Sequence, residues 1–261
     1  MIGKLFAIER IKAFNYNSFW YIMALYSVLL VLGYYVAGAF GTVTVNGEQV
    51  DLPQFRVYEF PMLWHYLTYI AGFLHYLPAL LLILLVTNDI QFGIWRQHVA
   101  EGLERAHLVG AKVLMMALLS GYATVLVILT GLAFGLPGTE GASPAMILES
   151  ADFIIGFFVQ IFAYLTMAFV FAVAVKKPAQ AIIMLLVYSI VVERLIHFFL
   201  PGELSFFLPM AAFSSFISNP YMSIIGAEVV ETPFVNSFFA SLVWIIMLLG
   251  GIYAFVRYKD V

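Results

Sequence analysis

Two groups of ionisable residues could carry chemistry in this chain, which otherwise has few charges. In the first group, Glu193, Arg194 and His197 lie inside a long apolar stretch, where Glu193 and His197 are spaced to share one helix face. Ionisable groups within a membrane are costly and are therefore expected to bind a substrate or to move a proton. The alternative is a structural role near the end of the stretch, because Pro201 follows within about two helical turns.

The second group lies in a polar segment, residues 87–108, between two apolar stretches. Its charged residues include Asp89, Arg96, Glu101 and Arg105. On a helix, one face would carry the apolar residues Phe92, Trp95, Val99, Leu103 and Ala106. Gly93 and Gly102 would interrupt this helix, so we expect it to be short. It either lies on the lipid surface with its charges solvated, or docks as a coupling helix in a cleft of a partner protein.

Sequence patterns for catalysis and for metal binding are absent. The chain contains no G-x-S-x-G, no H-E-x-x-H and no G-x-x-x-x-G-K-[ST] pattern. It has no cysteine, and His65 and His75 are too far apart in sequence for two ligands on one helix face. We therefore expect no catalytic residue, no metal and no cofactor in the chain itself.

Composition places the chain among the integral membrane proteins. Hydrophobic residues make up 64% of its 261 residues and charged residues 10%, against about 25% charged in ordinary soluble domains. A membrane-spanning helix needs roughly 20 apolar residues. We expect an all-α integral membrane protein with one transmembrane domain over residues 1–261. Its six predicted spans are Ser18–Phe40, Tyr66–Val86, Val109–Leu136, Phe153–Val175, Ala179–Leu200 and Phe234–Val256.

The basic residues predict the orientation of the spans. Ten of the 12 Lys and Arg residues fall in segments that six spans place on one side of the membrane, and only Arg56 and Arg194 fall on the other. Basic residues are enriched on the cytoplasmic side. Both termini are therefore expected in the cytoplasm.

Three segments outside the spans also have an expected structure. Residues 1–17 form either an interfacial elbow helix or a basic flank alone. The outer sequence Val45-Asn46-Gly47-Glu48 predicts a small β-hairpin. Residues 201–233 have no Lys or Arg, and prolines interrupt their apolar runs, so we expect short re-entrant or interfacial helices packed against their own subunit. This segment contains Phe207, Pro209 and Phe213.

Two features inside the spans predict helix packing. Gln160 is an isolated polar residue in the fourth span, and we expect it to form a hydrogen bond between helices. Gly131 and Gly135 form a G-x-x-x-G pattern, which marks either close packing of two helices or a contact between two chains.

This order of segments resembles the permease subunits of ABC transporters of the ABC-2, or type V exporter-like, family. The resemblance covers nearly the whole chain: elbow, six spans, a polar loop after the second span and a broken apolar segment before the sixth. Its most specific residues are Thr87-Asn88-Asp89, Gly93-Ile94-Trp95-Arg96-Gln97, Gly102-Leu103-Glu104-Arg105 and Lys112. The stretch Trp64–Ala71 is similar to a subset of these permeases found in Bacteroidota.

The resemblance implies partners and site residues. A separate ATP-binding subunit would bind ATP and Mg²⁺, and this chain would join a second permease copy, or a homologous permease, in the lipid bilayer of a bacterial inner membrane. No nucleic acid is expected. The coupling helix that faces the ATP-binding subunit would include Asp89, Arg96, Glu101 and Arg105. The pathway or its outer gate would include Glu193, Arg194, His197, Phe207, Pro209 and Phe213.

The same resemblance implies a mechanism. Closure of the ATP-binding subunits would push the coupling helices and export a lipid-like, peptide or amphipathic substrate between the two permeases. The alternative is a non-transporting scaffold that transmits the motion of the ATPase to a periplasmic partner. A secondary transporter is a third choice, but it would need paired broken helices in two halves, and one broken segment is predicted here. The weakly amphipathic elbow departs from the family pattern.

Overall fold

Helices form nearly all of the chain that the structure describes. The computed structural model describes residues 2–39, 42–45, 48–51, 57–200, 207–220 and 234–258. Within this part, six helices are long and apolar enough to cross a membrane, in the predicted number and order. They are Asn17–Gly38, Leu63–Gln91, Arg105–Gly138, Pro144–Val175, Pro178–Phe199 and Phe238–Tyr258. The fold is that of a multi-pass helical membrane protein.

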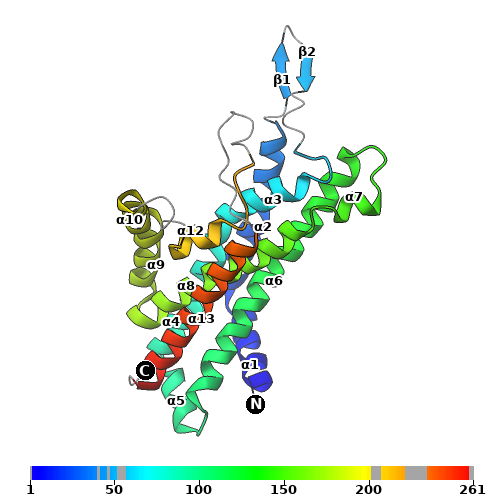
Figure 1. Ribbon diagram of the computed structural model, residues 1–261. Coiled ribbons are helices and arrows are strands. Elements are labelled where there is room, and N and C mark those ends of the chain that lie inside the picture. Colours follow the sequence, from blue (N-terminus) through cyan, green and yellow to red (C-terminus); the bar gives the residue numbers. More distant parts are fainter. Residues whose placement is uncertain are drawn as a thin grey trace.

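The elements are labelled in chain order (Figure 1). They are α1 (Ile2–Phe14), α2 (Asn17–Ala39), β1 (Thr42–Val45), β2 (Glu48–Asp51), α3 (Leu63–Gly72), η2 (Phe73–His75), α4 (Tyr76–Gln91), α5 (Ile94–Ala100), α6 (Arg105–Gly138), α7 (Pro144–Leu148), α8 (Asp152–Val175), α9 (Pro178–Val187), η3 (Tyr188–Val192), α10 (Glu193–Phe199), α12 (Pro209–Ser214) and α13 (Phe234–Tyr258).

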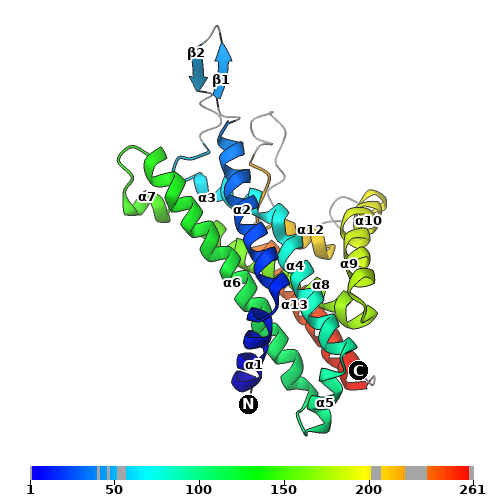
Figure 2. The same ribbon diagram turned by 180° about the vertical axis from the view of Figure 1, so that it is seen from behind.

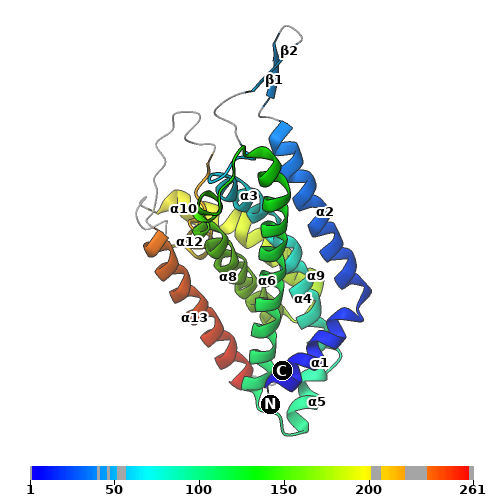
Figure 3. The ribbon, with the colours of Figure 1, turned by 90° about the vertical axis from the view of Figure 1, so that its right-hand side faces the viewer.

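The fourth span, which ends in α8, is the most buried of the six and lies at the centre of the bundle (Figures 1 and 3). α8 packs against α3, α4, α6, α9 and α13. Phe157, Ile161, Leu165 and Phe169 are fully buried along it, and their spacing of four residues places them on one stripe of the helix. The apolar core therefore runs along α8, and the other spans are arranged around it.

The second span is broken in the middle, which the sequence analysis did not predict. Its helix passes from α3 through the 3₁₀ turn η2 into α4. Pro78 follows this turn and has no N–H to donate to the carbonyl group of Leu74, so a regular α-helix cannot continue unchanged. Beside the break, the His75 ring stacks on Tyr164 of the neighbouring span α8 at 3.8 Å, and the Tyr76 hydroxyl lies 3.1 Å from Ser189 Oγ in the fifth span.

The fifth span contains a π-helical turn, η3, between α9 and α10. It is the least buried of the six spans, and its exposed apolar residues include Ile183, Val187, Ile190 and Val191. In the ribbon diagrams α9 and α10 stand at the edge of the bundle (Figures 1 and 2). A π-turn adds one residue to a turn and is frequent at functional sites.

Two glycines of α6 allow close packing against α3 within the same chain. A Cβ atom added to Gly131 would lie 2.2 Å from the Trp64 ring, and one added to Gly135 would lie 2.5 Å from Leu63. Both glycines are buried. Of the two alternatives for the G-x-x-x-G pattern, the structure therefore supports packing of two helices inside one subunit.

The predicted β-hairpin is present and extends beyond α2. Strands β1 and β2 pair antiparallel, with Val45 opposite Glu48. The hairpin lies at the opposite end of the bundle from α5, and both marked chain ends lie near α5 (Figures 1 and 3). We call these two ends of the bundle the hairpin end and the α5 end.

Candidate functional site

The α5 helix is held between two glycine turns. Gly93 precedes it with φ of 70°, and Gly102 follows it with φ of 87°. These left-handed conformations carry little cost for glycine and a real one for other residues. The turns let the chain leave α4, form the seven-residue α5 and return into α6, so that α5 projects at the end of the bundle (Figure 2).

The apolar face of α5 is narrower than the sequence predicted. Trp95 is buried and Val99 packs on the core, whereas the Phe92 side chain is 78% exposed. The prediction for Phe92 was wrong because the helix begins only after the left-handed turn at Gly93, which takes Phe92 out of the helical repeat. The other face of α5 is exposed and carries Arg96.

Polar contacts fix the end of α5. The Gln97 side chain donates a hydrogen bond to Glu101 Oε1 at 3.0 Å, and both residues are exposed. His98 Nδ1 lies 3.7 Å from Glu101 Oε2. The predicted coupling residues Arg96 and Glu101 therefore share one solvent-facing surface at the α5 end.

Asp89, also predicted for this surface, is buried instead in a cluster of four charged side chains. Its Oδ1 atom accepts a hydrogen bond from Lys12 Nζ at 2.6 Å, and its Oδ2 atom accepts one from Lys112. Lys112 also binds Glu9, and Lys12 lies 3.5 Å from the same Glu9 carboxylate. Asp89 is 4% exposed and Lys112 is 1% exposed. The two positive and two negative charges balance, as buried charges require.

This ionic cluster joins three elements beside α5. Glu9 and Lys12 belong to α1, Asp89 lies at the end of α4, and Lys112 lies in the second turn of α6. α1 packs along α6, so it is attached to the bundle by more than an interfacial contact. Lys12, one of the basic residues of the predicted elbow segment 1–17, contacts Asp89.

Arg105, the remaining predicted coupling residue, contacts the last span. Its Nη1 atom donates hydrogen bonds to the backbone carbonyl groups of Val256 at 2.7 Å and of Arg257 at 2.8 Å. These carbonyl groups lie in the last turn of α13, where no helical N–H follows to bind them and where a cation is favoured by the helix dipole. Arg105 thus links the start of α6 to the end of α13.

A cavity of about 460 Å³ opens between α5, α6 and α13 at this end. Trp95 and Leu108 form its apolar side, and Arg96 and Arg105 form its basic side. The α5 end therefore combines an exposed charged helix with an adjoining basic and apolar recess.

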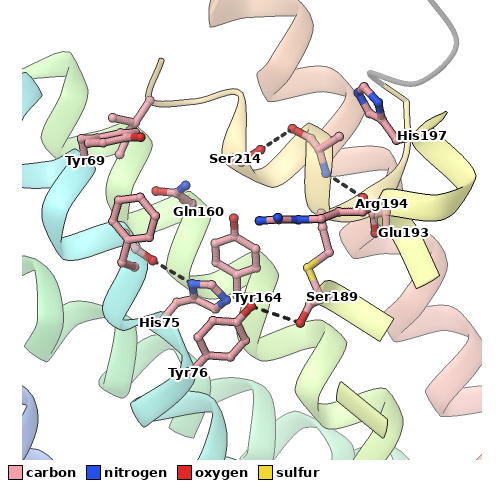
Figure 4. A pocket seen from close by; sticks show the side chains of 15 residues that line it. Tyr69, His75, Tyr76, Gln160, Tyr164, Ser189, Glu193, Arg194, His197 and Ser214 are labelled. Carbon is pink, nitrogen blue, oxygen red and sulfur yellow. Dashed lines mark hydrogen bonds between the residues drawn. The ribbon is translucent and has the colours of Figure 1, made fainter. Parts of the chain in front are cut away.

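A second cavity, of about 320 Å³, lies in the half of the bundle nearer the hairpin end and contains Glu193, Arg194 and His197 (Figure 4). Its other walls come from the broken second span, from α8 and from α12. The sequence grouped the three ionisable residues, and the structure adds Tyr69, Tyr76, Gln160, Tyr164 and Ser189. We call this cavity the outer pocket.

The Glu193 side chain shares a helix face with His197, as predicted from their spacing, but its hydrogen bond is with α12. Its Oε1 atom accepts a hydrogen bond from the backbone N–H of Ala211 at 2.8 Å, at the start of α12. Its Oε2 atom is buried and has no hydrogen-bond partner in the described chain. Gln160 was expected to bond to another helix, but its Oε1 atom is likewise buried and without a partner among the described residues.

The three residues proposed for the broken outer segment differ in their surroundings. Phe213 is fully buried and packs edge-on against Tyr164 at 5.7 Å, and Pro209 is buried at the first position of α12. Phe207 has an exposed side chain, but its carbonyl group accepts a hydrogen bond from Trp244 Nε1 at 2.7 Å. A short helix packed on its own subunit is thus present at residues 209–214. Residues 201–206 and 221–233 of the predicted segment lie outside the described residues.

Sequence reasoning did not predict the ionic cluster or the full outer pocket. The position of Lys112 at the start of an apolar span is a signal for a buried charge, but its partner Glu9 is 103 residues away in the chain. Comparison with family models and with curated proteins finds no match for this chain.

Proposed function

We propose that this chain is the membrane-spanning permease subunit of an ABC-2-type ABC transporter, driven by a separate ATP-binding subunit. One observation carries the proposal. The short helix α5 presents the exposed charge of Arg96 at the α5 end, and the chain on either side of it is anchored to the spans. Asp89, before α5, binds Lys12 of α1, and Arg105, after α5, binds the end of α13. A helix that only rests on lipid needs no such attachment, whereas a helix that receives a force does.

The attachments define how a force on α5 would spread. Asp89 precedes α5 and holds α1 and α6 through Lys12 and Lys112. Arg105 follows α5 and holds the end of α13. In this proposal Arg96 and Glu101 contact the ATP-binding subunit, while Asp89 and Arg105 pass its movement to the spans.

The remaining parts of the assembly follow from charge and exposure. The α5 end faces the cytoplasm in this proposal, because the basic residues of the polar segment and of both chain termini lie there. The exposed apolar side of the fifth span would contact a second permease copy. A lipid-like, peptide or amphipathic substrate would leave between the two copies, with Glu193, Arg194, His197 and α12 at the outer gate.

Charge reversal on α5 tests the proposal. Arg96→Glu is compared with the wild-type chain and with Lys177→Glu, which reverses an exposed basic residue between α8 and α9. Each variant is purified from the cells that normally make the chain. The measurements are the amount of copurified ATP-binding subunit and the ATP hydrolysis rate in liposomes.

Reversal of an interfacial charge costs several kcal/mol, so Arg96→Glu should lower both quantities by at least about tenfold, and Lys177→Glu should leave them unchanged. Wild-type values for Arg96→Glu and for Glu101→Arg would contradict the coupling role of α5.

A second candidate is a subunit that transmits ATPase motion without transporting a substrate. The observation that favours it is the β-hairpin, which extends from α2 beyond the helices and offers strand edges to a partner (Figure 1). Removal of residues 42–51 distinguishes the two candidates. The transmitting subunit would lose its activity but keep the ATP-binding subunit, whereas the permease would keep transport.

A further inference from the structure

The buried charges of the ionic cluster and of the outer pocket differ in their partners. In the ionic cluster at the α5 end, each buried charge has an opposite charge within hydrogen-bond distance. In the outer pocket, the buried carboxylate of Glu193 has no salt bridge with any described residue, although Arg194 is the next residue in the chain. Buried charge without a partner is costly in a low-dielectric surrounding. A role in folding alone therefore does not explain the Glu193 carboxylate, which lacks a positively charged partner among the described residues.

Two side-chain oxygens that line the outer pocket have no hydrogen-bond donor in the described part of the chain. Gln160 and Glu193 are each 4% exposed, and Gln160 Oε1 and Glu193 Oε2 are both buried without a hydrogen-bond partner in the described part of the chain. Tyr188, His197 and the Met210 N–H lie near the Glu193 carboxylate, and Tyr164 lies near Gln160. None of them makes a hydrogen bond of normal geometry with Glu193 Oε2 or Gln160 Oε1. An unpaired buried acceptor costs about 1–3 kcal/mol, and more when it is charged. A ligand with N–H donors would remove this cost.

Arg194 supplies the complementary charge. Its side chain points into the outer pocket, towards the side formed by Gln160 and Tyr164 (Figure 4). It takes part in no hydrogen bond or ion pair that involves a described residue, and it is exposed at the rim of the pocket. A guanidinium group with free donors binds phosphate or carboxylate strongly. The pocket thus has one place for a cation and one for an anion.

The walls and the size of the outer pocket narrow the ligand further. Tyr69, Tyr76 and Tyr164 line it, and aromatic faces attract ammonium groups. The cavity of about 320 Å³ is at the lower limit for small-ligand sites, so it suits a polar headgroup rather than a whole lipid. The rim residue Phe73, 63% exposed at the break in the second span, leaves an apolar border beside the opening.

We infer that the outer pocket binds a zwitterionic group, in which a primary ammonium contacts Glu193 and a neighbouring phosphate or similar anion contacts Arg194. An aminophospholipid headgroup and a soluble phosphoethanolamine both carry this chemistry. The site lies within one subunit and needs neither ATP nor the ATP-binding subunit. Its binding of a zwitterionic group can therefore be tested independently of the proposed function.

Lipid binding to the purified, delipidated full chain tests this inference. Native mass spectrometry measures retention of dioleoyl-phosphatidylethanolamine, dioleoyl-phosphatidylcholine and dioleoyl-phosphatidylglycerol offered in equal amounts. Phosphatidylcholine lacks N–H donors, and phosphatidylglycerol lacks the ammonium. We expect phosphatidylethanolamine to be retained at least about tenfold more tightly than phosphatidylcholine, because a charged hydrogen bond is lost with the latter.

Two variants locate the binding. Glu193→Gln keeps a side-chain oxygen for the Ala211 N–H and replaces the unpaired acceptor with a donor, so α12 stays attached while the preference for phosphatidylethanolamine over phosphatidylcholine is lost. Arg194→Gln lowers the retention of phosphatidylethanolamine and phosphatidylglycerol together. Glu149→Gln removes an exposed charge outside the pocket and leaves all three values unchanged. Equal thermal stability of the variants shows that folding is intact.

Soluble phosphoethanolamine distinguishes the two sources of the ligand. If it displaces the bound lipid, the zwitterionic group alone is recognised. If the preference for phosphatidylethanolamine persists without displacement, the site recognises that group on a lipid. Equal retention of phosphatidylethanolamine and phosphatidylcholine by the wild-type chain, or an undiminished preference in Glu193→Gln, would overturn the inference.

Discussion

Removal of Lys112 is the perturbation whose cost follows most directly from the structure. Lys112 is 1% exposed and contacts both carboxylates of the ionic cluster, Asp89 and Glu9. Lys112→Met keeps most of the side-chain length but leaves two carboxylates with one ammonium. Loss of one partner from a buried ion pair costs about 3–5 kcal/mol. Lys12 is still 2.6 Å from Asp89, so we expect the lower end, about 3 kcal/mol.

A double variant tests the electrostatic origin of this cost. Asp89→Leu combined with Lys112→Met removes one charge of each sign and leaves Glu9 and Lys12, which are three residues apart on α1 and still paired. Apolar replacement of a whole buried ion pair is often neutral or stabilising. The double variant should therefore regain at least about 2 kcal/mol relative to Lys112→Met alone.

The measurement is the free energy of unfolding in detergent micelles, followed by tryptophan fluorescence during denaturant titration. Lys177→Met is the control, because Lys177 is exposed and its loss should change stability by less than about 0.5 kcal/mol. A loss below about 1 kcal/mol for Lys112→Met, or a double variant as unstable as the sum of the single changes, would refute the role of the cluster.

Three further predictions concern other contacts. Arg105→Ala should destabilise the protein by about 1–3 kcal/mol, since two carbonyl groups of α13 lose their charged donor, and should increase amide hydrogen exchange at the end of α13. Gly131→Leu should prevent close packing of α6 on α3 and lower the melting temperature. Gly121→Leu on the same helix should not, because a Cβ atom there meets nothing within 4 Å. Similar melting temperatures for the two variants would contradict the role of Gly131 in this packing. A single cysteine at Glu140 should react with an impermeant thiol reagent from outside the cell and one at Glu101 should not, because the two exposed positions lie at opposite ends of α6; the reverse pattern would invert the topology.

The number and order of the spans could be predicted because long apolar runs are a local property of the chain. The break in the second span had a visible cause in Pro78, which lies inside the predicted span and cannot donate the backbone hydrogen bond of a regular helix. The π-turn at residues 188–192 had no such cause in the sequence, because its residues are ordinary apolar and hydroxyl types.

The candidate sites were predicted only where their residues are close in sequence. Glu193, Arg194 and His197 share one helix and were grouped correctly in the outer pocket. Gln160 and Tyr76 join them only through the packing of α8 and the second span, which a single sequence does not reveal. Asp89 and Arg105 were placed on an outward surface because charge was equated with exposure, whereas Asp89 binds two lysines and Arg105 binds backbone carbonyl groups of α13.

The proposed docking of α5 on an ATP-binding subunit can be tested directly by cross-linking. A photo-reactive cross-linker on a single cysteine at Gln97, an exposed residue of α5, tests it in the cells that make the chain, with Glu140 at the opposite end of α6 as the matched control position. The cross-linked proteins are identified by mass spectrometry. Gln97 should capture a protein with the Walker A pattern G-x-x-x-x-G-K-[ST], and Glu140 should not. Capture of lipid alone at Gln97, or equal capture of that protein at both positions, would contradict it.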